Sequence, residues 1–150
     1  MRHSLLLFVL LLSLLTGCSF SEKSAELVKS DVTEVNTLDE VSLEVLNDTL
    51  TPSGLTLHLI NSAEHSVGYN GSFSLERKIE GDWYVVNDVV GGRFAFTDEG
   101  LGTDKNSCTD MAIDWRGIYG ELDAGDYRIL FNVNNELENY TLATEFQIPK

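Results

Sequence analysis

Leu55-Thr56-Leu57-His58-Leu59 alternates apolar and polar side chains without a break. Successive side chains of a β-strand point to opposite faces, so this alternation predicts a strand with one buried face and one face in water. The same period of two recurs at residues 41–45, 73–79, 128–133 and 140–148. No segment after residue 40 shows the period of an amphipathic helix, so the pattern favours an all-β fold.

Turn-forming residues separate these segments. Glycine, proline, asparagine and aspartate gather at residues 51–54, 80–82, 90–92, 123–126 and 133–135. Such clusters are typical of tight connections between strands. Additional strands are expected at residues 83–86, 93–97 and 108–115. Seven to nine short strands with frequent turns predict an antiparallel β-sandwich.

Leu122-Asp123-Ala124-Gly125-Asp126-Tyr127 places a tyrosine at the start of an alternating strand, directly after a glycine turn. This order is typical of a tyrosine corner, in which the phenol hydroxyl bonds to the backbone a few residues upstream. We therefore expect Tyr127 to form a structural tyrosine corner. The alternative is an ordinary tyrosine on an edge strand.

Several segments taken together resemble the bacterial immunoglobulin-like domain family that is often found in envelope lipoproteins. They lie at residues 55–62, 67–69, 73–77, 81–86, 113–115, 119–122, 125–129 and 145–148. The resemblance spans residues 41–149. It implies an immunoglobulin-like sandwich without the disulfide between the sheets, no enzymatic activity, and no catalytic residues to carry over. The lone Cys108 departs from the family pattern and has no role that the resemblance explains.

The N-terminus has the three parts of an export signal. Met1-Arg2-His3 is cationic, residues 5–15 are nearly all apolar, and Leu15-Thr16-Gly17-Cys18 follows directly. The apolar run is shorter than the roughly 20 residues that span a bilayer and fits the core of a signal peptide. The last four residues resemble a bacterial lipobox, which implies cleavage between Gly17 and Cys18 and a thioether-linked diacylglyceryl lipid on Cys18. The alternatives are a plain secretory leader and an uncleaved membrane anchor.

The lipobox predicts how the protein is organised and where it is found. Two or more acyl chains give stable anchoring, so we expect attachment to the membrane through Cys18, on the side facing away from the cytoplasm. The membrane is the cell membrane or the outer membrane, and Ser19 is compatible with outer-membrane sorting. Residues 1–17 are the expected signal peptide, residues 18–40 a lipidated, acidic and flexible tether, and residues 41–150 the folded domain, expected to be a monomer.

The chain is strongly acidic, with a net charge of −14. Arg2 is the only charged residue before Cys18, so removal of residues 1–17 would take the charge to −15. Nucleic acids and anionic lipid headgroups repel such a surface, which argues against nucleic acid as a partner. The acidity favours solubility at a crowded surface, and the alternative is attraction to cationic partners or divalent ions.

The sequence offers little catalytic or metal-binding chemistry. Its two cysteines are Cys18 and Cys108, so lipid on Cys18 leaves Cys108 without an intramolecular partner, in a structural or incidental role. His58 lies on the polar face of a strand and His65 in a turn, where we expect both to be solvated. One cysteine and two separated histidines do not make a zinc site. We therefore expect no catalytic residues, no metal site and no cofactor.

Two features leave alternatives open. The loop at residues 98–106 carries oxygen ligands that could hold calcium, but Lys105 interrupts it and the twelve-residue calcium-loop pattern is absent. The aromatic residues are expected to lie mostly in the core, although some at loop ends could contact a protein or a sugar. They are Tyr69, Trp83, Tyr84, Phe94, Phe96, Trp115 and Tyr119.

Three functions are compatible with these observations. The leading hypothesis is a lipid-anchored envelope lipoprotein with a non-catalytic, immunoglobulin-like binding or accessory domain, whose protein partner is unknown. The second is a lipoprotein that inhibits an envelope or host hydrolase, such as a cationic lysozyme. The third is an enzyme that uses scattered carboxylates, which are abundant enough to make any single pair uninformative.

Overall fold

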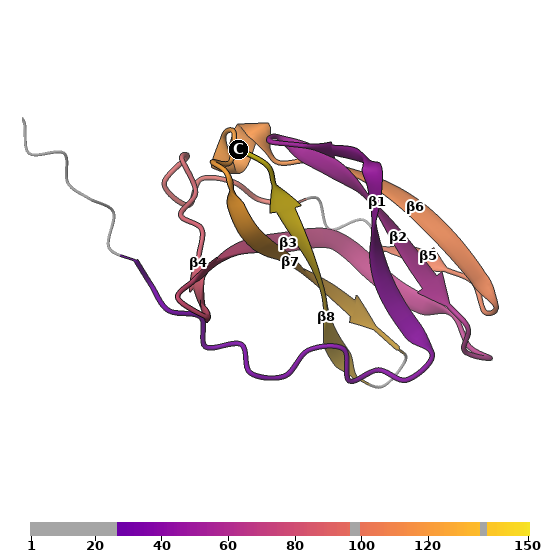
Figure 1. Cartoon of the computed structure of the whole chain (residues 1–150). Helices are drawn as coiled ribbons and strands as arrows, with labels where there is room; N and C mark the ends of the chain where they lie inside the picture. Colours follow the sequence, from indigo (N-terminus) through magenta and orange to yellow (C-terminus); the bar gives the residue numbers. More distant parts are fainter. Residues whose placement is uncertain (1–26, 97–99, 136–137) are drawn as a thin grey trace, which may run out of the picture.

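The computed structural model describes residues 27–96, 100–135 and 138–150. Two antiparallel sheets face each other (Figure 1). The smaller sheet has the order β1-β2-β6, with β1 Val41–Thr51, β2 Gly54–Asn61 and β6 Ser107–Asp114. The larger sheet has the order β4-β3-β7-β8, with β4 Asp82–Val85, β3 Val67–Ile79, β7 Gly125–Asn134 and β8 Asn139–Ile148. The short β5, Leu101–Thr103, pairs with one end of β3, and a single helical turn, α1 Arg116–Tyr119, follows β6.

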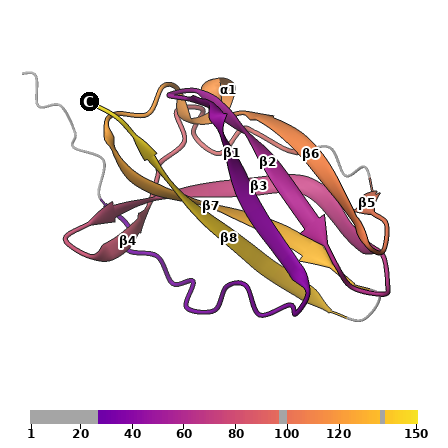
Figure 2. The ribbon, with the colours of Figure 1, turned by 45° about the vertical axis from the view of Figure 1, so that its right-hand side comes forward.

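The core lies between the two sheets, whose ribbons are seen from a second direction in Figure 2. Leu57 and Leu59 of β2 are fully buried, as are Leu75 of β3 and Phe131 of β7. Trp115 closes one end of this core, where its Nε1 donates a hydrogen bond of 2.9 Å to the carbonyl oxygen of Pro52. The predicted antiparallel β-sandwich is therefore confirmed, with eight strands in the described residues.

The strand predicted at residues 93–97 was wrong for residues 93–96, which form an irregular segment. Two ring contacts hold this segment instead. The Phe94 and Phe96 rings meet edge-on at 4.9 Å, and the Phe96 ring lies 5.1 Å from that of Phe73. The alternation of apolar residues correctly predicted that one side of the segment is apolar. That side packs through aromatic rings, however, and the segment does not pair with a strand.

The expectation of a flexible tether was wrong for residues 27–36, which lie against the larger sheet (Figure 1). The segment begins beside β4, where Val85 N donates to Val28 O at 2.8 Å and Ser30 N donates to Trp83 O at 2.9 Å. It ends at β8, where the Asn36 side chain exchanges two hydrogen bonds with the backbone of Ala143. We call residues 27–36 the N-terminal strap.

Candidate functional site

A groove of about 480 Å³ opens between β6 of the smaller sheet and β3 of the larger sheet. Its lining comes from strands β3, β5, β6 and β7, from the irregular segment after β4, and from α1. The lining residues are Tyr69, Gly71, Phe73, Phe94, Phe96, Leu101, the stretch 110–114, Ile118 and Phe131. We call this cavity the aromatic groove.

Aromatic rings form a large part of the apolar wall of the groove. Tyr69 and Phe131 lie 5.6 Å apart between ring centroids, and Phe73 contacts both Phe96 and Tyr119. At the rim, Phe94 is 47% exposed and Leu101 is 49% exposed. Large apolar side chains left in water beside a cavity are typical of surfaces that bind a partner. The groove can therefore accept apolar side chains.

One side of the groove is an open strand edge. β6 is the last strand of its sheet and pairs with β2 on one side. Directly after β6, Trp115 N donates to Ser53 O at 3.0 Å, toward β2. Backbone direction alternates along an antiparallel strand, so Ala112 and Asp110 direct their N–H and C=O groups away from β2. Within residues 27–96, 100–135 and 138–150, no other strand pairs with this edge.

The outer face of the smaller sheet is acidic beside this edge. Asp110 and Asp114 alternate with the inward-facing Met111 and Ile113. His58 Nδ1 lies 2.5 Å from Asp110 Oδ1, across the register of β2 and β6. Asp114 accepts a hydrogen bond from the backbone N–H of Arg116. The edge of β6 therefore presents carboxylates on its solvent side and an apolar cavity on the other.

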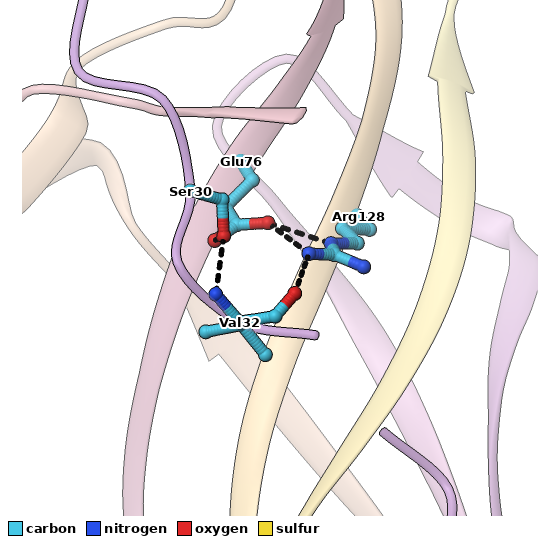
Figure 3. A network of polar contacts seen from close by, with 4 residues as sticks. All are labelled: Ser30, Val32, Glu76 and Arg128. Carbon is cyan, nitrogen blue, oxygen red and sulfur yellow. Dashed lines mark hydrogen bonds and ion pairs between the residues drawn. The ribbon is translucent and has the colours of Figure 1, made fainter. Parts of the chain in front are cut away.

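The N-terminal strap lies over a buried ion pair between β3 and β7 of the larger sheet (Figure 3). Arg128 of β7 donates from Nε and Nη2 to Glu76 Oε2 of β3, each at 2.6 Å. Ser30 Oγ donates to Glu76 Oε1 at 2.5 Å, and Arg128 Nη2 donates to Val32 O at 3.4 Å. The Arg128 guanidinium also lies 4.7 Å from the Trp83 ring centre. The strap therefore supplies partners that a buried ion pair requires.

The alternation pattern missed this site. In the alternating segments 73–79 and 128–133, Glu76 and Arg128 occupy polar positions, which the pattern predicts to face water. One signal was available, because Ile129-Leu130-Phe131 is a continuous apolar run and such runs mark strands buried on both faces. Leu130 is 5% exposed on the same face as Arg128.

Tyr127 contacts the turn that precedes its strand. Its hydroxyl donates to Asp123 O at 2.9 Å, four residues upstream, and the residue is 2% exposed. The ring stacks on Phe146 with centroids 5.7 Å apart. Burial raises the pKa of the Tyr127 phenol above 10.0, and the positive charge of Arg77 opposes part of this rise.

The other candidate residues from the sequence do not come together in one site in the part of the chain that the structure describes. Cys18 lies outside the described residues. Cys108 is a free, exposed cysteine on β6, and His65 is exposed in the connection between β2 and β3. Asp98 and Glu99 of the suggested calcium loop also lie outside the described residues, so calcium binding stays a prediction. Among the residues that the structure does describe, no cluster of His, Cys, Asp and Glu has a geometry that could hold a metal ion.

Comparison with known families identifies the fold. The profile of the family described as bacterial Ig-like domain matches residues 37–147. The chain belongs to the bacterial Ig-like domain family. The match covers every strand of this Ig-like domain from β1 to β7 and nearly all of β8, and it starts directly after the N-terminal strap.

No curated protein matches the chain. Within the described part of the Ig-like chain, no helix has the length and apolar character needed to cross a membrane.

Proposed function

We propose that this chain is a lipid-anchored lipoprotein of the cell envelope whose bacterial Ig-like domain is a non-catalytic binding or accessory module. Membership of the Ig-like family supports the accessory role. The sequence Leu15-Thr16-Gly17-Cys18 supports the anchor. The observation that carries the binding role is the aromatic groove, with Phe94 and Leu101 about half exposed at its rim.

The arrangement of the domain suits a module held at a membrane. The strap starts beside β4, at the end of the domain opposite to β5 (Figures 1 and 2). Cys18 precedes Leu27 by nine residues, and nine extended residues reach at most about 30 Å. A lipid on Cys18 would therefore keep the β4 end near the bilayer, while the groove beside β5 stays accessible to a partner.

Inhibition of a cationic hydrolase, such as a lysozyme, is a second candidate function. The net charge of −14 favours it, because an acidic surface steers toward a basic protein. In this case the groove or a neighbouring loop would contact the hydrolase.

Fractionation of cells that produce Cys18→Ala tests the anchor. The unchanged chain is expected in the membrane fraction, processed at Gly17, whereas the variant is expected to lose both the lipid and this processing. Cys108→Ala is the matched control and should behave as the unchanged chain, because Cys108 is an exposed residue of the domain. A Cys18→Ala variant that stays in membranes and is fully processed would contradict the anchoring proposal.

Chemical cross-linking in the envelope tests the binding role. A stable structural partner supports the binding module, and a hydrolase whose activity falls on binding supports the inhibitor. Turnover of a glycan by the purified chain would contradict both, because it would make the domain an enzyme.

A further inference from the structure

We propose that the open edge of β6 binds an extended peptide in which basic and apolar side chains alternate. The peptide would pair with β6 as an added strand and place its apolar side chains in the aromatic groove. This inference rests on the proposed binding function and gives the chemistry of the ligand. It begins with an edge that is unpaired in the described residues, next to a cavity.

The backbone groups along the free edge of β6 favour a ligand that has peptide groups of its own. Asp110 and Ala112 both line the groove and direct their N–H and C=O groups away from β2. An extended peptide satisfies such groups through a new ladder, which is how strand addition gives affinity. A lipid chain or another purely apolar ligand offers neither donors nor acceptors. The strand edge therefore favours a peptide over a lipid.

The inner face of β6 determines which positions of the peptide are apolar. Met111 and Ile113 point into the sandwich and line the groove together with Phe73 and Phe96. Side chains of an added strand alternate in step with those of β6. Every second side chain of the peptide would therefore enter the groove, whose aromatic wall accepts apolar groups.

The outer face of β6 determines which side chains the peptide carries at the positions between its apolar ones. Asp110 and Asp114 belong to the strand that lines the groove, but they alternate with the inward-facing Met111 and Ile113, so their side chains lie on the outer face of the sheet. Opposite charges on neighbouring strands stabilise their pairing, and like charges destabilise it. The peptide positions between the apolar ones would therefore be lysine or arginine.

Charge also argues against a second copy of the chain as the occupant. Each copy carries a net charge of −14. Antiparallel pairing of two β6 strands centred on Ala112 would place Asp110 of one copy opposite Asp114 of the other. The repulsion of these carboxylates adds to that of the two acidic domains.

Synthetic peptides test the proposal directly on the full chain, purified in detergent. The first probe alternates lysine and valine over roughly seven residues, a length that pairs with most of β6. The second has the same composition, with all lysines before all valines. The third has glutamate in place of lysine. We expect the first to bind at least about tenfold more tightly than the second, and the third not to bind.

Variants of the edge separate strand pairing from charge attraction. Proline is tolerated on an edge strand where the N–H faces outward, so Ala112→Pro should fold and lose one donor of the new ladder. Ala112→Thr is the matched control, since it keeps the N–H and favours a strand. Ala112→Pro should weaken binding of the alternating peptide at least about tenfold, and Ala112→Thr should leave it nearly unchanged. Phe94→Ala, at the exposed rim of the groove, should also weaken it.

Hydrogen exchange gives a reading that does not depend on affinity. The amides of Asp110 and Ala112 should become protected when the alternating peptide binds, because they enter a ladder. Equal affinity for the first and second peptides, unprotected amides, or no binding at all would overturn the proposal. Each of these results can occur while Cys18 is lipidated and a partner is cross-linked in the envelope, so they are distinguishable from failure of the proposed function.

Discussion

Glu76 and Arg128 form a buried ion pair on the face of the larger sheet that points away from the core. They are direct partners in the register of β3 and β7, and their side chains are 3% and 10% exposed. Ser30 and Val32 of the strap complete their hydrogen bonds. The pair therefore links the segment that follows the expected lipid anchor to the two central strands of the sheet.

Removing one partner of this pair should destabilise the domain strongly. Arg128→Met leaves the Glu76 carboxylate buried without its counterion, and such losses cost about 3–5 kcal/mol. The double variant Glu76→Leu/Arg128→Met removes both charges and should recover most of this loss, since apolar replacements of buried pairs are often neutral. Urea denaturation gives the free energy of unfolding for each variant.

The exposed pair of Lys78 and Glu145 is the control for this experiment. Their closest atoms lie 3.5 Å apart, and both side chains are more than a third exposed. Lys78→Met should therefore cost less than about 1 kcal/mol. Similar losses for Arg128→Met and Lys78→Met would show that the Glu76–Arg128 pair is not buried in solution.

The sequence predicted the inner faces of the strands better than their outer faces. Alternation identified Leu57, Leu59 and Phe131 as core residues because apolar side chains repeat on one side of a strand. It could not show that residues 27–36 cover the other side, because coverage depends on where a distant segment lies. Glu76 and Arg128 were therefore expected in water, although they are buried.

The groove also depends on contacts that the local sequence pattern does not predict. Phe94 and Phe96 have the spacing of a strand, and local pattern does not specify whether a segment finds a partner edge. Here the ring contacts among Phe73, Phe94 and Phe96 hold the segment as an irregular stretch and not as a strand. Tyr127 is the contrasting case, since its contact with Asp123 is only four residues away and local sequence is informative about such contacts.

Loss of the Tyr127 hydroxyl should cost stability without disturbing the core. Tyr127→Phe keeps the ring stacked on Phe146 and leaves the Asp123 carbonyl without its donor, so we expect a loss of about 1–3 kcal/mol. Asp126→Ala removes an exposed hydrogen bond with Gln147 and should cost less than about 0.5 kcal/mol. Equal urea midpoints for the two variants would rule out a stabilising tyrosine corner.

Alkaline pH should destabilise the domain through its buried phenols. Burial raises the pKa of Tyr69, Tyr119 and Tyr127 above 10.0 in the folded chain. Above about pH 10 the unfolded chain therefore loses protons that the folded chain retains, so the free energy of unfolding falls as the pH rises. The fall continues until the folded phenols ionise.

Thermal unfolding between neutral pH and about pH 11 measures this effect. Tyr127→Phe should show a shallower fall than the unchanged chain, because one of the three phenols is absent. Identical pH profiles would mean that Tyr127 ionises equally in the folded and unfolded chains.

The mass of the mature protein tests the lipoprotein account most directly. Intact-mass spectrometry of the chain extracted from membranes should give a polypeptide that begins at Cys18 and carries the added mass of a diacylglyceryl group. Fragmentation should place that mass on Cys18 and leave Cys108 unmodified. A mature chain that begins at another residue, or an unmodified Cys18, would contradict the account.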